Sequence, residues 1–276
     1  MLLLLDNCTA HDYTILTATD ILPAIESMRR SNSPSCKHGE PVKNLEPQAT
    51  VPQLSEDAQP GEILQKGLAA AGGAVQVACS FSVEDLVIID LIHKLHLPTG
   101  IFALDTGRLN EETYQVAEGI TERYGVAIDW FFPRREEVEE LLRAKGPFSF
   151  RESLENRHEC CRIRKIEPLG RALSGLKGWI TGMRKEQSTT RTALPCIEND
   201  VLHGGLLKIN PLANWSEAQV WDYAKKHRLP VNRLHAQGYP SIGCAPCTRA
   251  VAEGEHPRAG RWWWENPEHK ECGLHR

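Results

Sequence analysis

The feature that most constrains the fold is a regular alternation of short apolar segments and longer amphipathic segments, which begins near residue 60. Three apolar segments have the length of buried strands: 74–79, 100–104 and 127–132. The segments beside them have helical spacing, at 62–71, 83–96, 110–124 and 134–145. This alternation predicts an α/β domain in which helices flank a parallel sheet. A further strand is expected at 178–182, and a helix at 216–227 that starts with a capping box of Ser216 and Gln219.

The first 58 residues differ from the rest in composition. Between residues 31 and 54 the chain is polar, rich in Ser, Asn and Gln, and interrupted by prolines. Such a segment cannot bury enough apolar surface to fold by itself. We therefore expect residues 1–58 to be a partly disordered N-terminal extension and residues 59–276 to form the functional domain.

Charge and hydropathy exclude several classes of protein. The formal net charge of −4 argues against non-specific binding to nucleic acid, which depends on neutralising many phosphates. No apolar run approaches the roughly 18 residues that a membrane span needs. The opening run Met1–Leu5 is too short for a secretory signal, and no basic residue precedes it. We expect a cytoplasmic protein, with no membrane partner, whose thiols stay reduced.

Polar loops follow three of the predicted strands. Residues 80–85 read SFSVED, where the serines can either hold an anion or simply cap the next helix. Residues 104–108 read LDTGR, where the glycine fits either a close approach to a ligand or a turn. Residues 182–191 carry three cations, which suit either an anion site or a solvated loop. Because the carboxyl ends of parallel strands meet at one edge of the sheet, we expect a ligand site there.

Nine cysteines in a reducing compartment suggest metal ligation and a reactive thiol rather than disulfides. Cys160 and Cys161 are adjacent, and Cys244 and Cys247 form a C-x-x-C motif. Four thiolates suit either a tetrahedral zinc ion or an iron–sulfur cluster. Adjacent side chains on a helix diverge, which favours the larger iron–sulfur unit. Four unconnected core cysteines are the third alternative.

The ninth cysteine, Cys272, lies almost at the C-terminus in a segment that we expect to be mobile. The neighbouring Lys270, His275 and Arg276 favour its thiolate, while nearby glutamates oppose it. It is either a nucleophile or an incidental exposed thiol. Upstream, three consecutive tryptophans at 262–264 cannot all face one core. We expect them to anchor the tail while nearby arginines face an anion.

Together these motifs resemble the assimilatory adenylyl-sulfate reductases, which are relatives of the 3′-phosphoadenylyl-sulfate reductases. The matching segments are SFSVED, LDTGR, CCRIRKIEPL, ITGMRKEQ with the following TR, IGCAPCTR, GRWWWE and KECGLH. They run from about residue 60 to the end, and the double cysteine with C-x-x-C is typical of the adenylyl-sulfate branch. The resemblance implies an adenine nucleotide alpha hydrolase-like fold.

The resemblance also implies roles for particular residues. A [4Fe–4S] cluster would be held by Cys160, Cys161, Cys244 and Cys247. Cys272 would be the catalytic nucleophile. Substrate contacts would be made by Ser80, Ser82, Leu104, Lys165, Arg191, Arg258, Arg261 and His275. Phe81 departs from related pyrophosphate-cleaving loops, which carry glycine there, and this counts against ATP hydrolysis.

The implied reaction belongs to sulfate assimilation. The Cys272 thiolate would attack the sulfur of adenylyl sulfate and release AMP, leaving an S-sulfocysteine. Reduced thioredoxin, or a glutaredoxin-like donor, would then release sulfite. We expect the cluster to position Lys165 rather than to carry electrons. The rivals are a 3′-phosphoadenylyl-sulfate reductase, an ATP pyrophosphatase-type enzyme and a zinc-stabilised binding module. A homo-oligomer is left open.

Overall fold

The computed structural model describes residues 49–187 and 194–266, and these contain a six-stranded sheet. In chain order the strands are β1 (Val75–Cys79), β2 (Gly100–Leu104), β3 (Asp129–Phe131), β4 (Gly178–Ile180), β5 (Ile197–Asp200) and β6 (Leu206–Ile209). Across the sheet their order is β3-β2-β1-β4-β6-β5. The chain therefore moves from β1 outward to β2 and β3 and then returns to the other side of β1. This reversal creates a crevice between β1 and β4.

The sheet is mixed rather than wholly parallel. Neighbouring strands from β3 to β6 pair in parallel, as expected, but the edge strand β5 is antiparallel to β6. Only residues 201–205 connect β5 to β6. So short a connection can form a hairpin but cannot return the chain to the same end of the sheet.

Helices connect the strands and cover both faces of the sheet. The α-helices are α2 (Pro60–Ala71), α3 (Val83–Lys94), α4 (Glu111–Tyr124), α5 (Arg135–Lys145), α6 (Leu154–Cys161), α7 (Glu167–Leu173) and α8 (Glu217–Lys226). A π-helical segment, η2 (Arg162–Ile166), joins α6 to α7. Short 3₁₀ segments lie at η1 (Ser149–Arg151), η3 (Lys185–Gln187), η5 (Val201–His203), η6 (Arg233–Gln237) and η7 (Ala245–Cys247).

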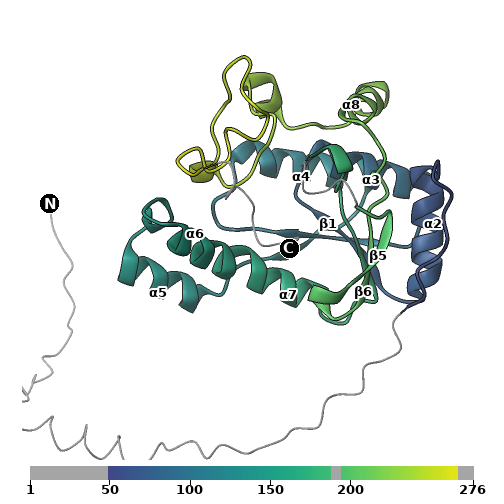
Figure 1. Cartoon of the computed structure of the whole chain (residues 1–276), viewed down its shortest axis with the longest axis horizontal. Coiled ribbons are helices and arrows are strands. Elements are labelled where there is room, and N and C mark those ends of the chain that lie inside the picture. The colour runs from purple at the N-terminus through teal and green to yellow at the C-terminus, as the bar shows by residue number, and fades with distance from the viewer. Residues whose placement is uncertain (1–48, 188–193, 267–276) are drawn as a thin grey trace, which may run out of the picture. The chain divides into compact units, whose positions relative to one another are not determined.

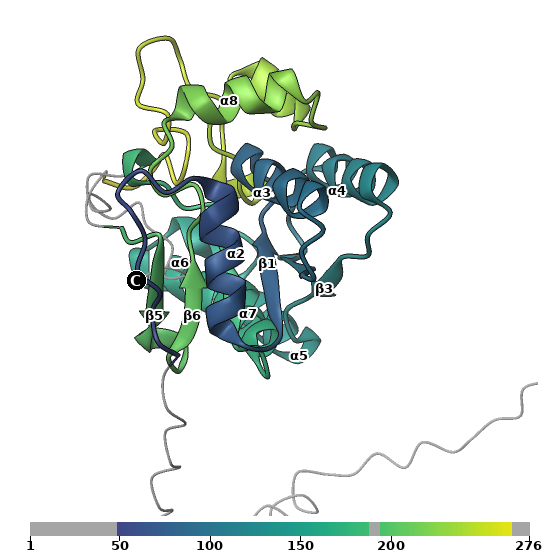
Figure 2. The same cartoon turned by 90° about the vertical axis from the view of Figure 1, so that its right-hand side faces the viewer.

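Two cores lie on opposite faces of the sheet. In Figures 1 and 2, α3, α4 and α8 lie on one side, and α5 and α7 lie on the other. Alternate residues of β2 explain the division: Ile101 belongs to the core under α3, whereas Phe102 packs with Leu169 and Leu173 of α7. Each large apolar side chain buried in this way stabilises the fold by about 1.5–3 kcal/mol.

Local signals set the ends of several helices. Pro60 occupies the first turn of α2, where its missing N–H costs nothing, and Gly72 ends the helix with φ of 60°. The expected capping box of α8 is confirmed, since the Ser216 N–H donates to Gln219 Oε1 at 2.8 Å and the Gln219 N–H donates to Ser216 Oγ at 3.2 Å. The bounds of α6, which carries Cys160 and Cys161, could not be predicted, because its sequence is mostly polar and has no apolar stripe.

Part of the predicted extension packs on the domain. Ala58 is buried, and Ala49 and Leu54 pack against the core under α3. Residues 1–48 lie outside the described residues, so the partial disorder expected of them stays a prediction. No helix in the described part of the chain is both long and apolar enough to cross a membrane.

Candidate active site

A cavity of about 380 Å³ opens at the carboxyl ends of β1, β2 and β4, as the strand order predicts. Six of the eight expected substrate contacts line it: Ser80, Ser82, Leu104, Lys165, Arg258 and Arg261. The structure thus brings together residues from loops that are far apart in the sequence. The other two, Arg191 and His275, lie outside the described residues, as does the expected nucleophile Cys272.

The loop after β1 is organised by a buried carboxylate that sequence reasoning missed. Asp85 is 2% exposed, and its Oδ2 accepts hydrogen bonds from the Ser80 N–H at 2.7 Å, the Ser80 hydroxyl at 2.8 Å and the Ser82 N–H at 3.2 Å. Burial raises the pKa of Asp85 to about 6, against the lowering effect of the Ser80 hydrogen bonds. The loop N–H groups are therefore already partly occupied by an internal anion.

Ser82 also caps α3, because its Oγ accepts a hydrogen bond from the Asp85 N–H at 3.4 Å. Of the two interpretations left open for this loop, the cap is confirmed, and the same serine lines the cavity. Between the two serines, Phe81 has φ of 66°, a left-handed conformation that is unusual for a bulky residue. Its buried ring stacks on Trp130 with centroids 5.4 Å apart, and this packing offsets the backbone strain.

The loop after β2 connects the cavity to the C-x-x-C motif. Asp105 Oδ1 accepts from the Gly107 N–H at 2.7 Å, and the Arg164 guanidinium donates to the Thr106 carbonyl at 2.6 Å. The Ala245 N–H, between the two cysteines of the motif, donates to the Arg108 carbonyl at 2.8 Å. The Thr106 hydroxyl and Cys244 Sγ are 3.3 Å apart. Thr106 therefore touches the cavity on one side and a cysteine on the other.

The four cysteines that were expected to bind a metal line a second cavity. None of the four forms a disulfide; Cys160, Cys161 and Cys244 are buried, and Cys247 is partly exposed. Three residues line both cavities: Lys165, Cys244 and Trp262. The second cavity therefore adjoins the first through a shared wall.

The pKa values of Cys247 and Cys244 are shifted by burial and by nearby charged groups. Burial, together with the neighbouring Cys244, raises the pKa of Cys247 to about 12. Burial also raises the pKa of Cys244, but the Lys165 charge and the Thr106 hydroxyl outweigh it, so this pKa lies below its ordinary value. A multivalent cation would relieve the repulsion among several thiolates, so the donor set fits a metal group.

The spacing of the donors bears on the kind of group. Within residues 49–187 and 194–266, no three His, Cys, Asp or Glu side chains are arranged to hold a metal ion. Four thiols around one cavity are donors that both a tetrahedral zinc ion and an iron–sulfur cluster take, so the donor chemistry fits either group.

Lys165, which lines the shared wall, lies within a π-helical turn. The Glu167 N–H bonds the carbonyl of Arg162, five residues earlier, and Pro168 has no N–H that could bond the carbonyl of Arg164, four residues earlier. This wider turn follows Cys161 directly, and such turns are frequent at functional sites. Arg164, within the turn, is buried and hydrogen-bonds Cys160, which lowers the pKa of that thiol against the larger effect of burial.

The three tryptophans diverge, as expected. Trp262 is buried in the shared wall, Trp264 packs against Phe150 with ring centroids 5.8 Å apart, and Trp263 is exposed. The Trp262 ring has three cations near its face, with centroid distances of 4.6 Å to Arg157, 4.9 Å to Arg261 and 6.0 Å to Lys165. Sequence reasoning missed Arg157, which no motif marked.

Arg261 is held in place by the backbone before the C-x-x-C motif. Its guanidinium donates to the Ile242 carbonyl at 3.1 Å and to the Ser241 hydroxyl at 3.4 Å. A Cβ on Gly243 would collide with this guanidinium. A larger residue at this position would therefore push the Arg261 guanidinium away from its place beside Cys244.

Comparisons with known proteins agree with this architecture. The model of the phosphoadenosine phosphosulfate reductase domain matches residues 74–250, which include both cavities except for the C-terminal segment. The crystal structure of phosphoadenylyl-sulfate reductase from Candida auris, in a phosphate complex, is similar with a TM-score of 0.59 and 29% sequence identity. That similarity covers 73% of this chain and 100% of the other.

Several curated relatives are similar over most of the chain. The adenosine 5′-phosphosulfate reductase of Allochromatium vinosum is 52% identical over 203 residues, which are 74% of this chain and 79% of the relative. The protein of the same name from Burkholderia cepacia is 46% identical, covering 82% of this chain and 90% of the relative. The chloroplastic 5′-adenylylsulfate reductase 3 of Arabidopsis thaliana is 48% identical over 80% of this chain, and the chain spans only 49% of that relative.

Proposed function

The chain belongs to the phosphoadenosine phosphosulfate reductase family, and within it we propose that this protein reduces adenylyl sulfate to sulfite and AMP in sulfate assimilation. One observation carries the proposal: a cavity of nucleotide size shares the wall of Lys165, Cys244 and Trp262 with a four-cysteine cavity. The names of the curated relatives support adenylyl sulfate as the substrate. We propose that the reaction takes place in the cytoplasm.

We propose that Cys272 attacks the sulfur of adenylyl sulfate. A bond forms between Cys272 Sγ and the sulfur, the bond from that sulfur to the phosphate oxygen breaks, and AMP leaves with the electron pair. Lys165, Arg258 and Arg261 line the cavity and would offset the charges of phosphate and sulfate, which otherwise repel a thiolate. We propose that Arg191 and His275 complete this anion site.

The second half of the reaction needs a dithiol donor, which we propose to be reduced thioredoxin or a glutaredoxin-like protein. One donor thiolate attacks Cys272 Sγ and releases sulfite, which leaves with the electron pair of the broken sulfur–sulfur bond. The second donor thiol then displaces Cys272, so that the donor ends as a disulfide and the Cys272 thiol is restored. The donor thereby supplies both electrons.

We further propose that Cys160, Cys161, Cys244 and Cys247 hold a [4Fe–4S] cluster. When bound, the cluster would supply a negatively charged, polarisable group beside Lys165. Its iron and sulfide contents and its visible absorption test this assignment. A colourless protein with one zinc ion would contradict it.

The reaction is tested by anaerobic incubation of the cluster-loaded protein with adenylyl sulfate alone, followed by intact-mass measurement and peptide mapping. We expect a sulfonate on Cys272 that reduced thioredoxin discharges as sulfite. Cys272→Ser should form no adduct, whereas Cys196→Ser, a partly exposed cysteine outside both cavities, should behave as wild type. Sulfite formation by Cys272→Ser at the wild-type rate would refute the proposed chemistry.

The second candidate substrate is 3′-phosphoadenylyl sulfate, which the name of the matching family and of the Candida auris structure favours. Both nucleotides can be offered to one sample in competition, with the released AMP and adenosine 3′,5′-bisphosphate measured separately. Preferential release of the bisphosphate would replace adenylyl sulfate as the substrate and leave the Cys272 chemistry intact.

A further inference from the structure

The cavity of about 380 Å³ is lined by charges of both signs. Lys165 and Arg261 lie close together, since both approach the ring of Trp262, and we call their side of the cavity the cationic end. We call the other end the acidic end and define it by Glu84, Glu186 and Glu217. These glutamates come from the start of α3, the loop after β4 and the start of α8.

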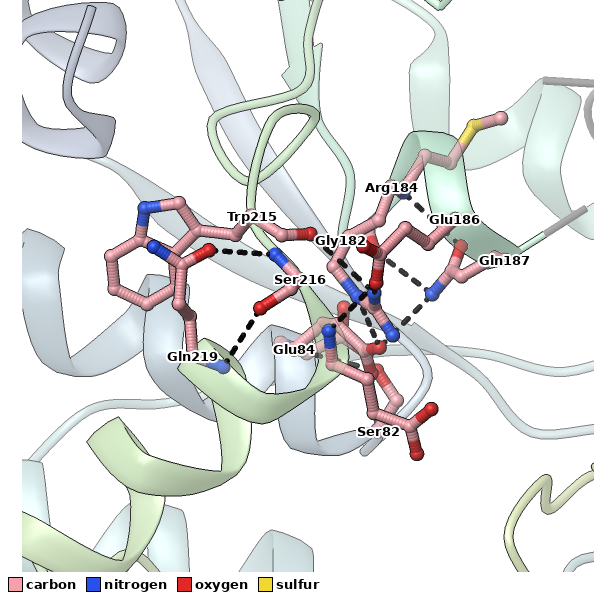
Figure 3. A network of polar contacts seen from close by, with 12 residues as sticks. Ser82, Glu84, Gly182, Arg184, Glu186, Gln187, Trp215, Ser216 and Gln219 are labelled. Atoms are coloured by element: carbon pink, nitrogen blue, oxygen red, sulfur yellow. Dashed lines mark hydrogen bonds and ion pairs between the residues drawn. The ribbon is translucent and has the colours of Figure 1, made fainter. Parts of the chain in front are cut away.

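Contacts shown in Figure 3 tie the acidic end together through Arg184. Arg184 Nε donates to Glu84 Oε1 at 3.0 Å, and its Nη1 lies 3.5 Å from Glu186 Oε2. The Glu217 N–H donates to the same Glu186 oxygen at 3.0 Å. Gln187 adds a neutral donor, from its Nε2 to Glu84 Oε1 at 3.0 Å.

The charge of Arg184 is largely consumed by these contacts. Its side chain is 5% exposed and lies against two carboxylates and the Trp215 carbonyl, at 3.5 Å. His235 faces Glu84 and Glu217, but burial lowers its pKa more than these carboxylates raise it, so it stays neutral at pH 7. The three glutamates and Arg184 together carry a formal charge of −2.

We propose that the acidic end is a specificity determinant that rejects adenine nucleotides carrying a 3′-phosphate. The inference rests on the proposed function, because it places an adenine nucleotide in this cavity. With its 5′-phosphate at the cationic end, the nucleoside extends toward the acidic end. A second phosphate on the ribose would bring up to two more negative charges toward carboxylates that are already in contact with Arg184. Such repulsion discriminates between the two nucleotides even if the preferred nucleotide, AMP, makes no contact with these glutamates.

The test compares two ligands that need no turnover, AMP and adenosine 3′,5′-bisphosphate, by calorimetric titration of the cluster-loaded full-length protein. The readout is the ratio of their dissociation constants. Repulsion between a phosphate dianion and one carboxylate about 8 Å away, in a water-like dielectric, raises the Kd by about fivefold. We therefore expect Glu186→Gln and Glu217→Gln each to shift the ratio toward the bisphosphate by about fivefold, and the double variant by more.

The matched control is Glu122→Gln, which removes the same charge from an exposed position of α4 that does not line the cavity. We expect its ratio to equal that of wild type. Raising the ionic strength should narrow the wild-type preference for AMP, since salt screens exposed charges. Circular dichroism checks that each variant is folded, and the two substituted glutamates are exposed enough for a glutamine to fit.

Two results would overturn the inference: a wild-type protein that binds the bisphosphate as tightly as AMP, or a double variant with the same ratio as Glu122→Gln. Failure of the proposed function looks different. In that case neither sulfated nucleotide gives sulfite, while the binding ratio of the double variant still shifts.

Discussion

A buried ion pair fixes the segment that leads toward Cys272, and its removal should be costly. Arg157 Nε and Glu265 Oε1 are 2.6 Å apart, and their side chains are 1% and 9% exposed. Removing one partner of a buried pair costs about 3–5 kcal/mol, because the other charge is left without compensation. Arg157 also lies 4.6 Å from the Trp262 ring centroid, a contact that survives in Glu265→Gln. We therefore expect the lower bound, about 3 kcal/mol.

Thermal unfolding and urea unfolding of the cluster-loaded protein measure this loss. For a protein of this size, about 3 kcal/mol corresponds to a fall in Tm of about 6–12 °C. The matched control is Glu159→Gln, because the Lys145–Glu159 pair has the same 2.6 Å separation but side chains that are 41% and 37% exposed. Exposed pairs contribute at most about 1 kcal/mol. Equal losses in the two variants would refute the argument that burial sets the cost.

Three further predictions concern the loops around the cavity. The pKa of Asp85 is raised to about 6, so between about pH 4 and pH 6 the folded state holds a proton that the unfolded state has released. The free energy of unfolding should therefore fall by up to about 3 kcal/mol as the pH rises through this range. In urea titrations across the range, Asp85→Asn should remove that fall. Phe81→Ala should lower the free energy of unfolding by about 3–5 kcal/mol. Phe81→Gly should be about 1 kcal/mol more stable than the alanine variant, because glycine tolerates the positive φ. An alanine variant more stable than the glycine variant would contradict the backbone strain at residue 81. Gly243→Ala should displace the Arg261 guanidinium. In calorimetric titrations AMP should then bind about tenfold more weakly, as expected for the loss of one charge-assisted contact. An unchanged affinity for AMP would show that Arg261 does not bind the phosphate.

The central strands could be predicted from the sequence almost to the residue. Residues 100–104 were expected as a strand and form β2, and 74–79 contains β1, because a run of apolar residues ends sharply at a polar loop. The antiparallel edge strand β5 could not be predicted in the same way. Three of the four residues of Ile197–Asp200 are polar, since an edge strand is only partly covered and needs no continuous apolar run.

The site was predicted where its residues lie in motifs and missed where they act through long-range packing. The four cysteines share a cavity because the turn at Ala245–Cys247 docks on the loop after β2. Asp85 was read as part of a helix start, but its carboxylate turns back to bond the Ser80 N–H, which depends on its burial beneath the loop. The Arg157–Glu265 pair joins distant parts of the chain, and no local pattern reports it.

The residues of the shared wall connect the two cavities electrostatically. Three cations gather around the single buried ring of Trp262, and one of them, Arg157, is balanced by Glu265. Lys165 and Arg261 both lower the pKa of Cys244, although burial opposes them, and both also line the nucleotide-sized cavity. An anion that enters this cavity must therefore compete with the thiolate of Cys244 for the same positive charges. Because such coupling is reciprocal, any change that weakens the hold of these cations on Cys244 should strengthen their hold on the anion.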